Sequence, residues 1–237
     1  DPTAPNFVKL YRQFLDYKYF YGIDRPTIIC EGPTDRVYLR AAIRHHVDDF
    51  PGLAFRDEKS VKLVPRILGA SATTDRVLGL GGGSGDLSNL ICRYKKDAAT
   101  YTFRKPAAPV IIICDNDDGA KKIFSSIRST SRHPIVDGSQ TYYHVFGNLY
   151  VAPLPKILGQ PTDIERLLSD RLTTGTYNGK TFHRGGEGFD RAQHFGKIKL
   201  SEFVSRLSTA KDDFSMFENV LQAVVEIQED YVKNGWR

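Results

Sequence analysis

Hydrophobic positions recur with two different spacings along this chain. Short apolar runs, such as Thr27 to Cys30 and Val110 to Cys114, alternate with segments in which apolar residues recur every three or four positions. Runs of the first kind indicate buried strands, and segments of the second kind indicate amphipathic helices. The alternation predicts an α/β fold in which helices cover a mostly parallel, Rossmann-like sheet. In such a sheet, ligands bind beyond the carboxyl ends of the strands.

Two ends of the chain are expected to be helical. In the segment from Phe7 to Tyr21, an apolar face predicts an aromatic-rich helix that packs on the next part of the chain; this face comprises Phe7, Leu10, Phe14, Tyr17 and Tyr21. A second apolar-periodic helix is expected from about Met216 to Val232.

Strands, turns and helices follow one another between these two ends. "RPTIICEGPTDRVYLRAAIRHHV" predicts a strand, a turn and a helix capped by Thr34. "RVLGLGGGSGDLSNLICRYKK" predicts a strand, a glycine loop and a helix, and "APVIIICDNDDGAKKIFSSIRS" repeats that order. "TYYHVFGNLYVAPLP" predicts two strands around Gly147-Asn148.

Composition narrows the class of protein. The 237 residues are 41% hydrophobic and 26% charged, which excludes a generally disordered chain. No apolar run is long enough to cross a membrane and no signal peptide is visible, so we expect a cytoplasmic protein with no membrane partner. The net charge of +5 suits a polyanionic partner. Because the chain lacks an initiator Met and opens on a Pro-containing polar segment, we expect it to be part of a longer protein.

The apolar run that ends at Cys114 leads directly into carboxylates. Asp115 and Asp117 are two positions apart, so they point the same way if the strand geometry continues. Two like charges so placed call for a cation or a shared proton, and oxygen ligands favour Mg²⁺ or Mn²⁺. The alternative is that Asp117 or Asp118 caps the next helix.

The first strand ends in a similar way. Glu31 is expected at the strand tip and Asp35 at the start of the helix, so a tight Gly32-Pro33 turn can aim both carboxylates into one crevice. The alternative is a helix cap together with an exposed acid.

Taken together, "IICEGPTD" and "VIIICDNDDG" resemble the two acidic motifs of the TOPRIM domain, which occurs in topoisomerases, primases and nucleases. The resemblance implies a catalytic domain over 26–172, after a linker and N-terminal helix (1–25) and before a loop and helical extension (173–237). It also implies that Glu31, Asp35, Asp115 and Asp117 are catalytic metal-binding residues, with proton transfer as an alternative role for Glu31.

The glycine-rich loop lies between the two acidic motifs. Its backbone N–H groups, at Gly81, Gly82, Gly83 and Ser84, suit a phosphate group, although a tight turn alone would also use one or two glycines. The overcoming-lysogenization-defect (OLD) nucleases have a similar loop.

Two later segments resemble the continuation of OLD-type TOPRIM nucleases. In "PTDIERLLSD", Glu165 together with Asp163 would complete a second metal position; the alternative is that both belong to a helix start. In "HFGKIKLSEFV", Lys197, or alternatively Lys199, would stabilise charge on the phosphate.

The segment "KLYRQFLDYKYFYGIDRPTIICEGPTDRVYLRAAI", residues 9–43, resembles the region that joins the polymerase to a C-terminal TOPRIM extension in some retron reverse transcriptases. These resemblances imply a nuclease with two Mg²⁺ ions that acts as the toxic effector of an antiphage system, beside a reverse transcriptase domain and its RNA-linked DNA. RNA, including transfer RNA, is favoured over DNA as substrate. The alternative is a non-catalytic TOPRIM module for nucleic-acid binding or for docking to the polymerase. The sequence leaves open whether the chain forms a homo-oligomer.

Overall fold

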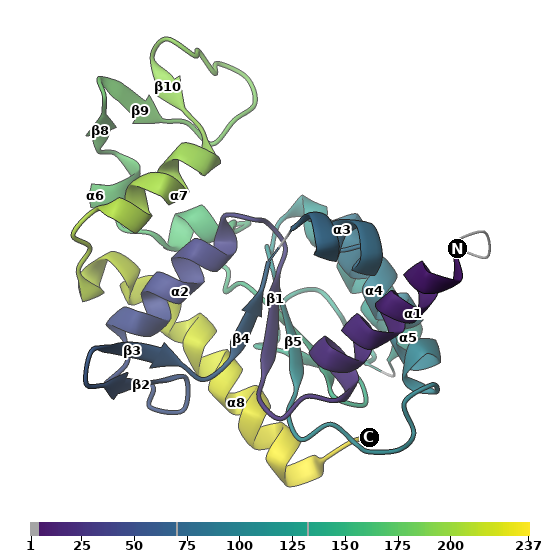
Figure 1. Cartoon of the computed structure of the whole chain (residues 1–237). Helices are drawn as coiled ribbons and strands as arrows, with labels where there is room; N and C mark the ends of the chain where they lie inside the picture. Colours follow the sequence, from purple (N-terminus) through teal and green to yellow (C-terminus); the bar gives the residue numbers. More distant parts are fainter. Residues whose placement is uncertain (1–4, 70, 132) are drawn as a thin grey trace.

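A five-stranded sheet of order β4-β1-β5-β7-β6 forms the centre of the computed structural model (Figure 1). The structure describes residues 5–69, 71–131 and 133–237. Neighbours pair in parallel except for β6, which runs antiparallel to β7 at one edge. The strands are β4 (Arg66–Leu68), β1 (Thr27–Cys30), β5 (Val110–Cys114), β7 (Leu149–Pro153) and β6 (Tyr143–Phe146). The prediction of a mostly parallel sheet covered by helices is therefore confirmed.

Helices cover both faces of this sheet, which explains why the central strands are almost purely apolar. Neighbouring strand residues point to opposite faces, so Ile111 and Ile112 lie in two separate apolar clusters. The cluster that holds Ile111 includes side chains of α2 (Asp35–His45), α7 (Lys197–Arg206) and α8 (Glu218–Asn234). The cluster that holds Ile112 includes side chains of α4 (Ser84–Ala98) and α5 (Lys121–Thr130). The predicted C-terminal helix is confirmed as α8.

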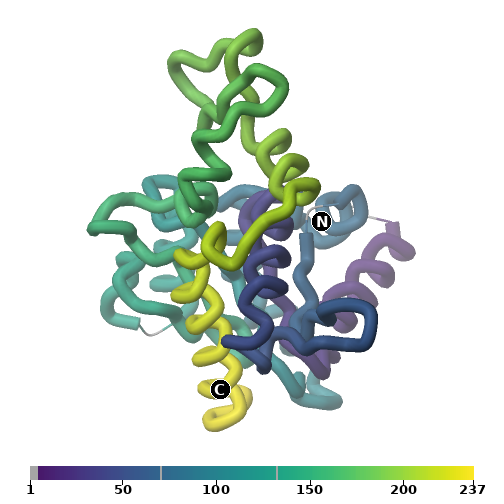
Figure 2. The backbone as a smooth tube through the Cα atoms, turned by 90° about the vertical axis from the view of Figure 1, so that its left-hand side faces the viewer, coloured from purple at the N-terminus to yellow at the C-terminus, as the bar shows by residue number. Residues whose placement is uncertain are grey.

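The remaining elements extend this core. A β2–β3 hairpin flanks α2, and the strands β8 to β10 form a small three-stranded sheet that stands out from the body in Figure 2. None of the described helices is both long and apolar enough to cross a membrane. These elements are α1 (Asn6–Asp16), η1 (Tyr17–Tyr21), β2 (Ala54–Asp57), β3 (Ser60–Leu63), α3 (Ala72–Leu78), η2 (Asp118–Ala120), η3 (Ile164–Leu167), α6 (Asp170–Thr173), β8 (Thr176–Tyr177), β9 (Lys180–Phe182), β10 (His194–Phe195) and η4 (Lys211–Phe217).

The strand predicted before the glycine loop is wrong, because this segment is helix α3. The Ser71 side chain accepts a hydrogen bond from the Thr74 backbone N–H, and the Thr74 side chain accepts one from the Ser71 backbone N–H. This capping box starts a helix, and Gly79 ends it at a φ of 63°. The strand position is taken by β4, which lies earlier in the chain and pairs with β1.

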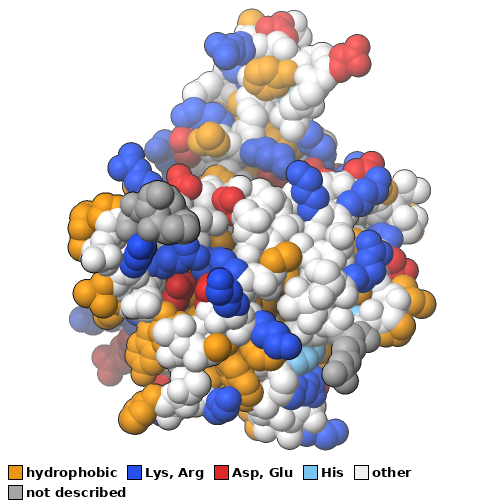
Figure 3. Space-filling view, turned by 90° about the vertical axis from the view of Figure 1, so that its right-hand side faces the viewer, with side chains coloured by type: hydrophobic (Ala, Val, Ile, Leu, Met, Phe, Trp, Pro, Cys, Tyr) orange, Lys and Arg blue, Asp and Glu red, His pale blue; other side chains and the backbone are white. Residues whose placement is uncertain are grey.

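The predicted packing face of the N-terminal helix is wrong at four of its five residues, since only Tyr21 of this face is buried. Phe7, Leu10 and Phe14 are 74%, 68% and 55% exposed, whereas Leu15 and Phe20 are buried. The π-helical turn η1 breaks the 3.6-residue period at the end of this face, where Tyr17 is 44% exposed but Tyr21 is buried. Figure 3 shows several hydrophobic side chains exposed on one side of the molecule.

Candidate active site at the carboxyl edge of the sheet

Two carboxylates that are far apart in the sequence meet where β1 and β5 end. The strands pair in parallel with Cys30 opposite Ile113, so the residues that follow them emerge side by side. The backbone N–H of Asp115 donates a hydrogen bond of 3.2 Å to Oε2 of Glu31. The Glu31 carboxylate thus reaches the Asp115 backbone, and its charge also raises the pKa of the Asp115 carboxyl, so both side chains belong to one site at the carboxyl edge of the sheet.

Asp35 is held against the same edge by the turn between β1 and α2. Its Oδ2 accepts a 2.6 Å hydrogen bond from the Gly32 backbone N–H, and its Oδ1 accepts one of 3.3 Å from the Thr34 hydroxyl. Thr34 stands at the predicted N-cap position, but its side chain makes no capping hydrogen bond to the backbone. The turn thus fixes the direction of Asp35, which is only 8% exposed.

Burial and mutual repulsion make negative charge costly in this cluster. Burial, together with the charges of Asp35 and Glu31, raises the pKa of Asp115 to about 8, although Lys197 opposes the rise. Burial also raises the pKa values of Glu31, Asp35 and Glu165 above their ordinary range. A proton or a cation at this edge would relieve the repulsion.

Glu165 and Lys197 form a second part of the site. Glu165 is fully buried, and Lys197 Nζ lies 2.9 Å from its Oε2; its Oε1 has no hydrogen-bond partner in the part of the chain that is described. Burial lowers the pKa of Lys197, but Glu165 and Asp163 raise it by more, so the ammonium stays charged. The Ile164 backbone N–H donates a 3.2 Å hydrogen bond to Oδ1 of Asp115, which joins this segment to the first carboxylates.

Asp163 bonds chiefly to basic and backbone groups. Its Oδ1 accepts hydrogen bonds from the Arg166 backbone N–H at 3.2 Å and from Arg184 Nη1 at 2.6 Å, and Lys197 Nζ is 4.0 Å from its Oδ2. Asp163 therefore caps η3, as the alternative interpretation holds, while it also attracts the cationic side chains of Arg166, Arg184 and Lys197.

Among the described contacts, the Asp117 side chain bonds to the backbone and not to the other carboxylates. β5 ends at Cys114, and the exposed Asp117 side chain accepts a 2.8 Å hydrogen bond from the Gly119 backbone N–H, so it caps η2. Its charge still contributes to the raised pKa of Glu31. The next acid, Asp118, is paired with Lys121 at 2.8 Å. This arrangement matches the capping alternative for the second acidic motif.

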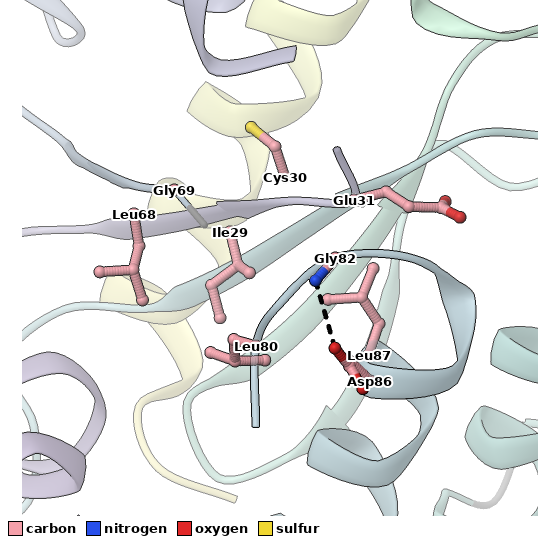
Figure 4. Close-up of a pocket in the computed structure, with 9 residues that line it drawn as sticks. All are labelled: Ile29, Cys30, Glu31, Leu68, Gly69, Leu80, Gly82, Asp86 and Leu87. Atoms are coloured by element: carbon pink, nitrogen blue, oxygen red, sulfur yellow. Dashed lines mark hydrogen bonds between the residues drawn. The ribbon is translucent and has the colours of Figure 1, made fainter. Parts of the chain in front are cut away.

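The glycine-rich loop lies beside Glu31, but the chain itself uses its donors. Oδ2 of Asp86 accepts hydrogen bonds from the backbone N–H groups of Gly81 and Gly82, at 2.9 and 3.2 Å. Figure 4 shows the bond from Gly82. The Gly83 N–H donates to the backbone oxygen of Glu31 at 2.9 Å, whereas the Glu31 carboxylate points away from Asp86. A phosphate that binds to these glycines would have to displace the Asp86 carboxylate.

Asn116 fastens the loop that carries Asp115. Its Nδ2 donates hydrogen bonds to the backbone oxygens of Gly138 and Leu154 at 2.9 and 2.8 Å. Its own backbone pairs with Thr162 in both directions. One buried amide thus connects three loops, including the one that leads to Glu165.

Two side chains of the site were missed by the sequence interpretation. Asp86 had a usable signal, because Ser84 is the first residue of α4 and an acid two positions later commonly reaches back to free N–H groups. Arg184 had none, because its contact with Asp163 bridges a glycine-rich stretch whose path the sequence does not reveal.

The donor set fits a hard divalent cation, although the site is not preassembled. Within the described ranges, no three His, Cys, Asp or Glu side chains gather closely enough to form a metal cluster. The site nevertheless has oxygen ligands, an incompletely bonded buried Glu165 and carboxylates that raise one another's pKa values. Mg²⁺ and Mn²⁺ prefer such ligands, and a cation would remove the repulsion that keeps them apart.

No protein-family model matches this chain, and a search of solved structures finds no match. The resemblance of the two acidic motifs to TOPRIM therefore stays a prediction from the sequence.

Proposed function

We propose that the chain is a metal-dependent nuclease of the TOPRIM type that hydrolyses phosphodiester bonds in nucleic acid. The observation that supports this most directly is the contact of Glu31 with Asp115 at adjacent strand ends, beside Asp35. Carboxylates from separate chain segments have no packing reason to be gathered at one partly buried edge, because their repulsion destabilises the fold.

In this proposal, Glu31, Asp35, Asp115 and Glu165 hold Mg²⁺ or Mn²⁺, while Asp117 stands further out. When bound, two such ions would activate water and neutralise the leaving oxygen of a phosphodiester. The protein side chains orient the substrate: Lys197 presents its ammonium next to Glu165 and would pair with a phosphate oxygen. With its pKa near 8, Asp115 can hold a proton at neutral pH until a cation replaces that proton.

The sequence resemblance extends the proposal to a biological setting. The chain would be the effector part of a retron antiphage system, kept beside a reverse transcriptase domain and its RNA-linked DNA. RNA, with transfer RNA as the leading candidate, would be the preferred substrate over DNA.

A second function is favoured by two observations. No metal cluster is preassembled in the described part of the chain, and Asp86 fills the glycine donors. Both would suit a non-catalytic module that binds nucleic acid or docks to the polymerase.

Cleavage assays separate the two functions. The protein is incubated with labelled DNA, messenger RNA and transfer RNA, with Mg²⁺, with Mn²⁺ or with EDTA. We expect metal-dependent cleavage, and we expect Asp115→Ala to lower its rate by about a hundredfold or more. Asp118→Asn is the matched control, because Asp118 lies in the same loop but is exposed and paired with Lys121. Full activity of a folded Asp115→Ala variant would refute the nuclease assignment, and absence of cleavage with every substrate and metal would favour the second function.

A further inference from the structure

A basic groove opens where α2, β3 and β4 meet, away from the carboxylates. It encloses about 460 Å³. Figure 2 shows that the β2–β3 hairpin lies beside α2. The cations that line the groove are Arg25, Arg40, Arg44, Lys62 and Arg66. No carboxylate is among the described residues that line it.

These cations are positioned but not neutralised. Arg40 Nη2 donates to the backbone oxygen of Ile67 at 3.3 Å, and Arg66 Nη1 donates to that of Lys18 at 2.9 Å. Only Lys62 has an acidic neighbour within the residues that the structure covers, at 3.8 Å from Asp57. Backbone carbonyls therefore orient the guanidinium groups while most of their positive charge faces solvent.

An arginine stripe leads from the basic groove to the carboxylate edge. Arg36, Arg40 and Arg44 recur every four residues, so they lie along one side of α2, which begins at Asp35. A Cβ atom on Gly69 would collide with the Arg36 side chain, which places Arg36 at the end of β4. With a rise of 1.5 Å per residue, Asp35 and Arg44 are about 14 Å apart along the helix axis, which is about four nucleotides at the B-DNA spacing.

We propose that the basic groove binds the sugar–phosphate backbone of a nucleic acid and that the arginine stripe guides this strand toward the carboxylate edge. Unpaired guanidinium groups at regular spacing suit a chain of phosphates, since each can donate two hydrogen bonds to one phosphate. Binding in the groove is independent of the proposed function, whereas its role in presenting a substrate rests on that function.

The test measures binding without cleavage. Labelled single-stranded RNA and DNA are titrated in EDTA, between about 50 and 200 mM salt. Arg25→Gln/Arg44→Gln removes two charges that have no hydrogen bond or ion pair among the described contacts. Arg56→Gln/Lys211→Gln is the matched control, because it removes two charges that pair instead with Asp48 and Asp49 at 2.7 Å. Circular dichroism and the unfolding midpoint check the fold, and Arg44→Gln/Lys62→Gln replaces the first pair if its midpoint falls.

We expect Arg25→Gln/Arg44→Gln to bind single-stranded nucleic acid about tenfold more weakly or worse. The slope of log K against log salt should shrink in magnitude by about 1.4, which corresponds to two lost phosphate contacts on a single strand. The control variant should keep the affinity and slope of the parent. Equal effects in both variants, or displacement by polyglutamate as effectively as by unlabelled nucleic acid, would overturn the proposal. The binding titrations contain EDTA and therefore do not depend on cleavage. The cleavage assay of Asp115→Ala tests the nuclease assignment separately.

Discussion

Replacing Lys197 with Met would remove the ammonium beside Glu165 and keep most of the apolar volume of the side chain. At 2.9 Å and an effective dielectric constant of about 20, the Coulomb attraction is about 6 kcal/mol. Water screens part of it, because the Lys197 side chain is 41% exposed, although Glu165 is fully buried. Breaking one partner of a buried pair costs about 3–5 kcal/mol, so we expect Lys197→Met to lower the free energy of unfolding by about 2–3 kcal/mol at pH 7.

Urea denaturation in EDTA measures this cost. The matched control is Lys199→Met on the same helix, because Lys199 pairs with Glu202 at 2.7 Å but both side chains are exposed; we expect a loss of less than about 1 kcal/mol. Glu165→Gln in the Lys197→Met background should restore part of the stability, since no buried charge is then left unpaired. The Lys197→Met penalty should also shrink as the pH falls, because protonation of Glu165 removes its charge. A penalty no larger than that of Lys199→Met would refute the reasoning.

Three further outcomes are expected. Burial raises the pKa of Asp16 to about 6, although Arg93 and Arg12 oppose the rise. The folded state therefore binds the Asp16 proton more tightly than the unfolded state does, and the stability that this proton contributes is lost as the pH rises from about 4 to 6. We therefore expect the free energy of unfolding of Asp16→Asn, relative to that of the parent, to be higher at pH 7.5 than at pH 5 by on the order of 1 kcal/mol. Urea denaturation at both pH values measures this, and an equal difference at the two values would contradict it. Gly82→Ala should destabilise the protein by about 1 kcal/mol or more, because Gly82 has a φ of 125° and an added Cβ would lie 3.3 Å from the Glu31 backbone oxygen. Thermal melts measure this loss. Gly85→Ala is the control and should be neutral or stabilising, because Gly85 lies in helix α4 with open space around it. Asp86→Asn should bind inorganic phosphate more tightly than the parent by isothermal titration calorimetry, since the carboxylate that competes for the glycine N–H groups is gone, and unchanged binding would show that these donors do not take phosphate.

The sequence predicted the central strands because burial on both faces leaves an unmistakable apolar run. β5 is buried at all five positions, and the adjacency of Glu31 and Asp115 followed from the carboxyl ends of parallel strands. β4 was missed because it has only three residues and begins with an arginine. The direction of Asp117 was not predictable from spacing alone, since it depends on where β5 ends and on the bond to Gly119. Arg184 belongs to a contact that the order of residues does not reveal, whereas the role of Asp86 could have been predicted from its place in the first turn of α4.

The buried amide of Asn116 has a consequence for motion at this edge. Because it ties the Asp115 loop to the loops before β6 and after β7, a displacement of one carboxylate-bearing segment would strain the other. The two halves of the carboxylate edge should therefore open together in a single cooperative fluctuation, with matching amide hydrogen-exchange rates for the backbone N–H groups of Asn116 and Thr162.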